Sequence, residues 1–572
     1  MTAIDPKQPL ARLNMPYVWA ISLTAALGGL MFGYDWIVIS GSKPFYERFF
    51  DVQTPAAEGW AMASALVGCL FGAALCGGLS DRLGRKWLLV LAAALFLVSS
   101  IGTALVDSFF AFNVWRVMGG LAIGLASNLS PMYIAEIAPA AWRGRLVAMN
   151  QFTIVIGILL AQGANYAIAK HGGGVDEAAV AQARLEPTAL DARGMAWELA
   201  WQVSGDHRPK LMEEFQQAYA RLVAGKPGSP SNAVEAIQKV NAARGDDKLQ
   251  IEPVALELAG RHLATWNAKL GWRWMFGVTA IPACLFCVLM LLVPESPRWL
   301  AKNGRGQAAH RVLTRIGGST HADRELAGIE ETLAGEIRRV DFRELVEPRM
   351  LTVLVLGVTL AVLQQWCGIN VIFYYATEIF KKAGYAVSEA LLNIVLIGAV
   401  NLVFTVIALF SVDRFGRRIL MIIGFAGLAM LHTLIGLLSY YHLQGLPVLL
   451  LTLAAIGCYG LSLAPITWVV LSEIFPNRIR GAALSISVIA LWAACFILTF
   501  TFPLLRDHLG LAGTFWIYAG ICAAGLLFVL ARLPETKGKS LEEIEHALTG
   551  RRDVSSRVPL GKGSDKMGLG KT

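Results

Sequence analysis

Twelve apolar segments, each long enough to cross a lipid bilayer, divide this sequence into two sets of six. A membrane-spanning helix needs about 20 predominantly apolar residues. The first six runs of this length lie near 17–40, 59–79, 87–107, 111–134, 146–169 and 272–293. The other six lie near 350–380, 388–411, 419–441, 446–471, 481–504 and 513–532. The sequence therefore predicts an all-α membrane protein with twelve transmembrane helices in two six-helix repeats.

The composition agrees with a chain whose surface faces lipid. Of the 572 residues, 55% are hydrophobic and only 16% are charged, and the mean hydropathy is +0.54. A soluble protein of this length would need more charge to cover its surface. The formal net charge of +9 could suggest a nucleic-acid partner, but the basic residues are concentrated in alternate loops. We therefore expect no nucleic-acid binding.

The distribution of lysine and arginine also predicts the orientation. Basic clusters follow the second, fourth, sixth, eighth and tenth spans, for example Arg82, Arg85 and Lys86 after the second. The protein is expected in the plasma or inner membrane. Because cytoplasmic loops are enriched in lysine and arginine, these basic loops and both termini are expected on its cytoplasmic side. The eight cysteines all lie in apolar runs, and no metal-ligand spacing stands out, so we expect neither a disulfide framework nor a metal site.

Two motifs repeat between the halves and reveal an insertion. Residues 81–86, DRLGRK, recur as DRFGRR at 413–418, and the stretch from Glu136 to Gly144 recurs from Glu473 to Gly481, an offset of 337 residues. The Pro-Glu pair at 294 recurs at 534, an offset of only 240 residues. The first half therefore carries about 97 extra residues. The polar stretch 170–270 accounts for them and is expected to form a small helical cap outside the cell.

These boundaries give the expected domain organisation. It consists of spans 1–5 in residues 1–169, the insertion in 170–270, span 6 in 271–295, a cytoplasmic helical linker in 296–349, spans 7–12 in 350–532 and a cytoplasmic tail in 533–572.

Seven short motifs resemble those of one known family. They are GGLSDRLGRK (77–86), RVMGG (116–120), PMYIAE (131–136), PESPRWL (294–300), QQWCGIN (364–370), VDRFGRR (412–418) and PETKG (534–538). The sequence resembles the sugar porters of the major facilitator superfamily, and in particular bacterial sugar–proton symporters, over nearly the whole chain except 170–270 and the tail. The resemblance implies the major facilitator fold, transport of a monosaccharide by alternating access, no cofactor, no enzymatic activity and function as a monomer.

Charged residues of these motifs gather at the cytoplasmic helix ends and are predicted to form a gate. Opposite charges on two bundles can close the inner side of the transporter and separate when it opens inward, although each exposed pair contributes only about 0–1 kcal/mol. The plainer interpretation is that these charges only set topology and solvate helix ends. The candidate gate residues are Asp81, Arg85, Glu136, Arg143, Glu295, Arg298, Asp413, Arg417, Glu473, Arg480 and Glu535.

Three amide side chains in the seventh span are candidate sugar contacts. Gln364, Gln365 and Asn370 flank Gly368, and unpaired amides are costly in lipid, so they should face a water-filled cavity. Each amide offers a donor and an acceptor, which suits neighbouring sugar hydroxyls. Gly368 would permit local unwinding. The alternative is that these amides join helices to one another; the family resemblance favours sugar binding here.

The resemblance adds further substrate contacts to the same cavity. An aromatic face can cover the apolar side of a sugar ring while amides bind its hydroxyls. A lone tryptophan is more often part of a core or of an interfacial belt. The residues that the resemblance places in the pocket are Phe32, Gln151, Tyr374, Asn401, Trp468 and Trp492.

Asp35 and Arg116 are the candidates for proton coupling. Asp35 lies inside the first span and Arg116 inside the fourth, where an ionisable residue is expensive and usually functional. We expect Asp35 to pair with Arg116 when ionised and to release it when protonated. The alternative is a purely structural ion pair in a sugar facilitator.

Other readings remain open from the sequence. Leu491 and Ile158 stand where relatives carry amides, and Gly460 lacks the carboxylate of mammalian glucose uniporters, so the sugar itself is not fixed. A sugar or polyol facilitator, a non-transporting sugar sensor, and a membrane-anchored module formed by the insertion are the alternatives. His432, in the ninth span, is expected to be a packed histidine rather than a proton relay.

Overall fold

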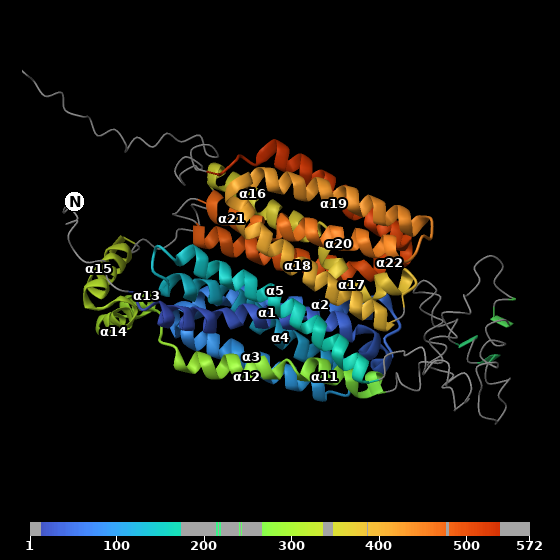
Figure 1. The fold of residues 1–572 in the computed structure, drawn as a ribbon, viewed down its shortest axis with the longest axis horizontal. Coiled ribbons are helices and arrows are strands. Elements are labelled where there is room, and N and C mark those ends of the chain that lie inside the picture. The colour runs from blue at the N-terminus through green and yellow to red at the C-terminus, as the bar shows by residue number, and fades with distance from the viewer. Residues whose placement is uncertain are drawn as a thin grey trace, which may run out of the picture.

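The computed structural model describes residues 13–172, 266–335, 347–385, 387–475 and 480–537, with a few isolated positions between 213 and 242. The predicted insertion lies almost entirely outside these residues, and so does most of the predicted tail. In the part described, the chain forms two helical layers, one from each half, and the shorter helices of residues 297–335 lie at one end (Figure 1).

The first half supplies six membrane-length segments. They are α1 (Met15–Phe50), α2 (Pro55–Leu83), α3 (Arg85–Leu105), α4 (Phe109–Ile137), α5 (Arg143–His171) and a sixth segment made of η2 (Asn267–Gly271), α11 (Trp272–Gly277) and α12 (Ala280–Leu292). Local signals start these helices where the sequence places them. Thr54 accepts a hydrogen bond from the backbone of Ala57 at the start of α2, and Ser108 does the same for Ala111 in α4.

The second half repeats this arrangement. It comprises α16 (Pro348–Trp366), α17 (Ile369–Lys382), α18 (Val387–Phe415), α19 (Arg417–Tyr440), α20 (Leu446–Leu461), α21 (Leu463–Ile474) and α22 (Arg480–Arg532). The described residues contain 11 helical segments long and apolar enough to cross a membrane. The last of these covers two predicted spans, divided by a kink at Gly510 with φ of 70°. The prediction of twelve spans in an all-helical membrane protein is therefore confirmed.

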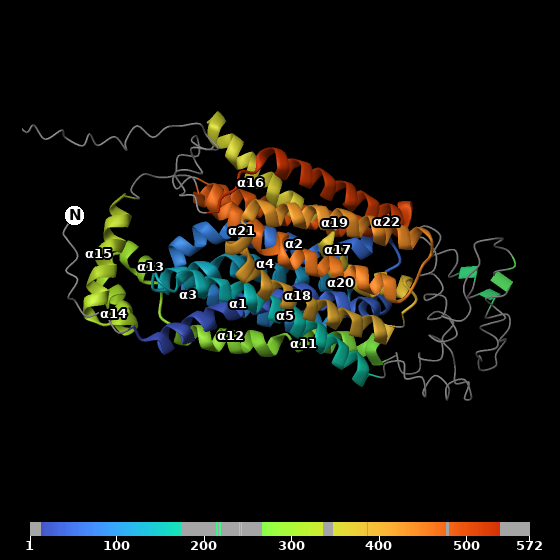
Figure 2. The same cartoon turned by 45° about the horizontal axis from the view of Figure 1, so that its top comes forward.

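Helices between the halves mark one end of the bundle, which we call the linker end. They are α13 (Pro297–Lys302), α14 (Gly306–Gly317) and α15 (Ser319–Gly335), and the backbone of Asn14 donates to Ile316 O at 2.7 Å, which docks the start of α1 on α14. The opposite end, where α1 finishes, is the distal end. A second view shows α13–α15 beyond the ends of the long helices (Figure 2).

Small residues allow the closest helix contacts in the first half. Gly68 and Gly72 of α2 face Gly120 and Gly124 of α4, and a Cβ added at any of the four would overlap backbone of the opposite helix. Two small residues four positions apart on each helix let the backbones approach closely, which is how helices gain packing energy in a membrane. This contact fixes α4, and with it Arg116, against α2.

A methyl group at Gly120 should therefore destabilise the fold. Gly120→Ala places its Cβ against the carbonyl of Ala65, and overpacking of this kind costs about 1–3 kcal/mol. We expect a lower melting temperature in detergent. Gly163→Ala on α5 is the matched control, because a Cβ there meets nothing within 4 Å. Equal melting temperatures for the two variants would contradict the close crossing of α2 and α4.

Candidate functional site

The charged motifs of the first half form a network at the linker end. Arg85 Nη2 lies 3.1 Å from Glu136 Oε1, and Arg85 Nη1 lies 3.3 Å from Asp81 Oδ1. Glu295 Oε1 accepts hydrogen bonds from the backbone N–H groups of Arg85 and Lys86 at 3.0 and 3.1 Å. The repeat motif thus holds the start of α3 against the ends of α4 and α12.

The second half repeats the arginine–glutamate and glutamate–backbone contacts of this network with its own copies of these residues. Arg417 Nη2 lies 3.0 Å from Glu473 Oε1, and Glu535 accepts from the backbone N–H groups of Arg417 and Arg418 at 3.0 and 3.2 Å. Partial burial tends to raise the pKa of Glu535, but the backbone N–H groups around its carboxylate outweigh burial and lower the pKa below the usual value. The sequence repeat is therefore also a repeat of contacts.

These pairs join residues within one half, whereas the predicted gate joins the two halves. Arg143 is exposed beside Trp142, and Arg298 is partly buried at the start of α13. The side chains of Asp413 and Arg480 lie outside the described part of the structure. A gate between the halves therefore stays a prediction.

Asp35 and Arg116 meet in the interior of the first half. Arg116 Nη1 lies 3.3 Å from both carboxylate oxygens of Asp35. The side chain of Arg116 is 2% exposed and that of Asp35 is 5% exposed. The guanidinium also lies over the ring of Phe276, 5.4 Å from its centroid. A Cβ at Gly119 would lie only 3.2 Å from Asp35 Oδ2, so the glycine leaves room for the carboxylate. The structure thus brings the two predicted proton-coupling residues together.

The seventh span breaks where the sequence predicts unwinding. The α16 helix ends at Trp366 and α17 begins at Ile369, with Gly368 between them at φ of 83°. Only glycine adopts this left-handed conformation without a steric cost, and a Cβ here would also press on Tyr518. The prediction of a local break at Gly368 is confirmed.

The break lets the three candidate amides form one chain of hydrogen bonds. Asn370 donates to Gln365, and Gln365 Nε2 donates to Gln364 Oε1 at 2.8 Å. Gln364 Nε2 in turn donates to the hydroxyl of Tyr459 on α20 at 2.6 Å. All three amides are buried. Amides linked in this way are held in fixed orientations.

An aromatic cluster connects the two halves beside this amide chain. The ring of Phe32 on α1 packs edge-on against Trp492 on α22, with centroids 5.8 Å apart. One turn further along α1, Trp36 packs against Tyr374 and Phe373 of α17 at 5.3 and 5.7 Å. The indole N–H groups of Trp36 and Trp492 are buried without a hydrogen-bond partner among the described residues. Buried donors of this kind are available to a polar ligand.

The remaining predicted contacts are placed individually. Asn401 on α18 is buried against Gly460 of α20. Gln151 on α5 is partly buried, and Trp468 on α21 is 40% exposed. The structure does not link these three to the amide chain, so their role in binding stays a prediction.

Sequence reasoning missed several residues that the structure brings to the site. Trp36 follows Asp35 directly and lies four residues after Phe32, a helical spacing that could have revealed it. Tyr459 gave no such signal, because a tyrosine near Gly460 in an apolar run is ordinary. His432 matches its prediction: it is fully buried, its Nε2 lies 2.8 Å from Cys367 O, and it packs against Phe515.

An apolar depression of about 690 Å³ lies elsewhere, on the outer face of α19 and α22. It is lined by residues such as Met430, Leu434 and Trp516 and contains none of the predicted site residues. Its position and lining suit acyl chains better than a polar solute.

Comparison with known proteins places these features in one family. The family model for the sugar (and other) transporters matches residues 21–181 and 257–548. The unmatched stretch falls inside the predicted insertion.

Two relatives and one solved structure match nearly the full length. The D-xylose-proton symporter of Escherichia coli (strain K12) is 35% identical over 93% of this chain and 96% of its own. The arabinose-proton symporter of Bacillus subtilis (strain 168) is 35% identical over 95% of this chain and 98% of its own. A partially occluded, inward-open structure of the xylose transporter from E. coli shares 33% identity and a TM-score of 0.68 over 92% of this chain and 100% of that one.

The buried pair of Asp35 and Arg116 makes a double-mutant test possible. Removing one partner leaves a buried charge without compensation, which costs about 3–5 kcal/mol. We expect Asp35→Asn and Arg116→Gln each to lower the melting temperature in detergent, and the double variant to be more stable than Arg116→Gln alone. Additive losses in the double variant would show that the two side chains do not stabilise each other.

Proposed function

The chain belongs to the sugar transporter family, and on this basis we propose that it carries a monosaccharide, either a pentose or a hexose, across a membrane together with a proton. The transport is by alternating access between the two six-helix halves, and one chain is sufficient because the binding residues come from its own halves. The family and the number of spans make the chain a multi-pass membrane protein.

One observation carries this proposal: two turns of α1 hold both the aromatic contacts to the second half and the buried carboxylate. Phe32 and Trp36 face Trp492, Phe373 and Tyr374. Asp35 points instead to Arg116 within the first half. A change in the charge of Asp35 therefore acts on the same short helical segment that touches the candidate sugar pocket.

The pocket has the chemistry that a monosaccharide requires. A sugar ring presents hydroxyl groups at its edge and C–H groups on its faces, so it needs hydrogen-bonding groups together with aromatic surfaces. The amides of Gln364, Gln365 and Asn370 supply the first, and the rings of Phe32 and Trp492 supply the second. The buried N–H of Trp492, which has no hydrogen-bond partner among the described residues, adds a donor to the aromatic wall.

Protonation of Asp35 supplies the coupling step. The ionised carboxylate holds Arg116 by direct contact at 3.3 Å, and a neutral carboxyl holds it far less strongly. Each charge that moves down a membrane potential of 100 mV releases about 2.3 kcal/mol. That amount is enough to concentrate a sugar tens-fold, since a factor of ten needs about 1.4 kcal/mol.

We further propose that the structure represents the inward-facing state, with the linker end and both termini in the cytoplasm. At the distal end the halves touch directly: Thr377 Oγ1 of α17 donates to Ser40 O of α1 at 3.0 Å. At the linker end, the described ion pairs of Arg85 with Glu136 and of Arg417 with Glu473 each lie within one half. This asymmetry is what a transporter closed to the outside and open to the cytoplasm would show.

Asp35→Asn separates symport from facilitated diffusion. In proteoliposomes with an imposed proton gradient, we expect the variant to lose sugar accumulation while it keeps sugar counterflow, because the neutral side chain no longer carries a titratable charge. The experiment uses a panel of labelled pentoses, hexoses and polyols, which also identifies the substrate. If the variant accumulates sugar as well as the native protein does, the protein is a symporter whose proton site lies elsewhere. Absence of accumulation in the native protein would make it a facilitator.

Trp492→Phe tests the aromatic wall of the pocket. The variant keeps an aromatic ring and loses the indole N–H, so we expect sugar to bind about tenfold more weakly, in line with a hydrogen bond of about 1–1.5 kcal/mol. Trp516→Phe on the same helix is the control, because that indole donates to Thr433 O away from the pocket. If both variants bind the sugar found in the panel as tightly as the native protein, Trp492 does not contact it.

A further inference from the structure

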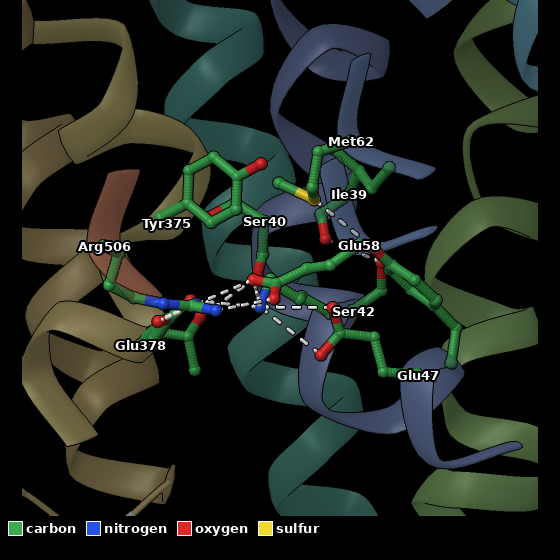
Figure 3. A network of polar contacts seen from close by, with 12 residues as sticks. Ile39, Ser40, Ser42, Glu47, Glu58, Met62, Tyr375, Glu378 and Arg506 are labelled. Carbon is green, nitrogen blue, oxygen red and sulfur yellow. Dashed lines mark hydrogen bonds and ion pairs between the residues drawn. The ribbon is translucent and has the colours of Figure 1, made fainter. Parts of the chain in front are cut away.

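A cluster of charged side chains is buried at the distal end, outside the site described above. It contains Lys43 and Glu47 of α1, Glu58 of α2, Glu378 of α17 and Arg506 of α22, and we call it the distal charge cluster (Figure 3). None of the five side chains is more than 5% exposed. Charges so far from water are costly unless they are well matched.

Two cations hold the cluster together. Lys43 Nζ lies 2.8 Å from Glu58, 3.1 Å from Glu47 and 3.2 Å from Glu378. Arg506 makes a two-pronged contact with Glu58, with both of its Nη atoms 3.0 Å from carboxylate oxygens, and it also binds Glu378. Glu58 and Glu378 therefore each contact both cations.

The cluster joins the two halves of the transporter. Lys43 reaches across from the first half to Glu378 in the second, and Arg506 reaches back from the second half to Glu58 in the first. Tyr375, on the same helix as Glu378, lies with its ring centroid 5.4 Å from Lys43 Nζ. Opening of the distal end must therefore break these contacts.

Among the side chains of the cluster itself, as the described residues show them, acids outnumber bases. Three glutamates share two cations, and Asp507, whose side chain is 7% exposed, also contacts Arg506 at 2.7 Å. Of the other described cations, Arg116 of α4 pairs with Asp35, and Arg273 of α11 pairs with Asp107. Lys381 and Lys382 follow Glu378 in the last turn of α17, where Lys381 is partly exposed and Lys382 is exposed. Arg48, at the last turn of α1, is partly exposed. A buried surplus of negative charge favours the uptake of a proton.

Among the three glutamates, Glu47 contacts the fewest cations of the cluster. Its side chain is fully buried, and Lys43 is the cation it contacts. Its Oε1 lies 3.1 Å from Lys43 Nζ but outside hydrogen-bond geometry, and this atom has no hydrogen-bond partner among the described residues. The neighbouring Tyr46 directs its hydroxyl to the sulfur of Met62 at 3.1 Å. Glu58 and Glu378, by contrast, have the arginine as a second cation.

We propose that the distal charge cluster is a second proton-binding site, with Glu47 as the acceptor, and that the bound proton holds the distal end closed. The proton lowers the repulsion among the three glutamates while the cross-half contacts of Lys43 and Arg506 remain. Loss of the proton restores the surplus charge and favours hydration and opening of the distal end. The site is separate from Asp35 and does not depend on the identity of the sugar.

Infrared spectroscopy of the purified full-length protein tests the proton directly. A protonated carboxyl group gives a carbonyl band that a carboxylate lacks. We expect one such band near neutral pH, shifted by ¹³C-labelling of glutamate and lost in Glu47→Gln. It should persist in Glu331→Gln, which changes an exposed residue of α15, and in Asp35→Asn, which separates this site from the one proposed for coupling. A glutamate band of full strength in Glu47→Gln would overturn the proposal.

A second variant covers the case in which Glu47→Gln does not fold. Asp507→Asn leaves Glu47 in place and removes one negative charge beside Arg506, so the band should disappear at a lower pH than in the native protein. An unchanged titration would contradict the role of the surplus charge. Closure of the distal end is measured by amide hydrogen exchange at the ends of α1 and α17. The exchange rates are corrected for the intrinsic effect of pH. We expect exchange there to increase with pH in the native protein and not in Glu47→Gln; equal pH dependence in both would overturn the link to closure.

Discussion

An ionised side chain inside a membrane protein needs a partner of opposite charge, because neither lipid nor packed protein replaces its hydration. In the described residues this requirement is met at three levels. Arg85 and Arg417 bind glutamates at the linker end, Arg116 binds Asp35 in the middle, and Lys43 and Arg506 share several carboxylates at the distal end. Only the middle level is a simple pair of one acid and one base. A single proton on Asp35 would therefore remove that ion pair directly, whereas at the ends a proton changes the balance within a larger group.

The α1 helix is the element that connects these levels. It begins against α14 at the linker end, carries Asp35 at its middle and ends with Lys43 and Glu47 in the distal charge cluster. The pair of Asp35 and Arg116 lies wholly within the first half, so it moves with that half as a unit. The neighbouring Trp36 and Lys43 instead contact α17 in the second half. In the proposed mechanism, a movement of α1 on protonation of Asp35 therefore acts on the candidate sugar pocket and on the distal contacts together.

The sequence is informative about features that depend on local pattern. Apolar length predicts the spans, the left-handed tolerance of glycine predicts the break at Gly368, and repeated motifs predict similar networks in both halves. It is uninformative about partner choice, because a helix-end charge can pair within its half or across to the other. The distal charge cluster was missed for a related reason: Lys43, Glu58 and Arg506 lie just outside the apolar windows, so hydropathy assigns them to helix ends near water. Pairing with each other allows them to be buried instead.

The surplus charge of the distal cluster also explains how a strongly bonded end can still open. Two buried ion pairs, Lys43 with Glu378 and Arg506 with Glu58, cross between the halves here and hold the distal end closed. A shift of the closed and open populations from 1:99 to 99:1 needs only about 5.5 kcal/mol. A perfectly balanced cluster would therefore tend to hold the transporter in one state. Repulsion among Glu47, Glu58 and Glu378 offsets part of the attraction, which brings the two states close enough in free energy for sugar and protons to shift between them.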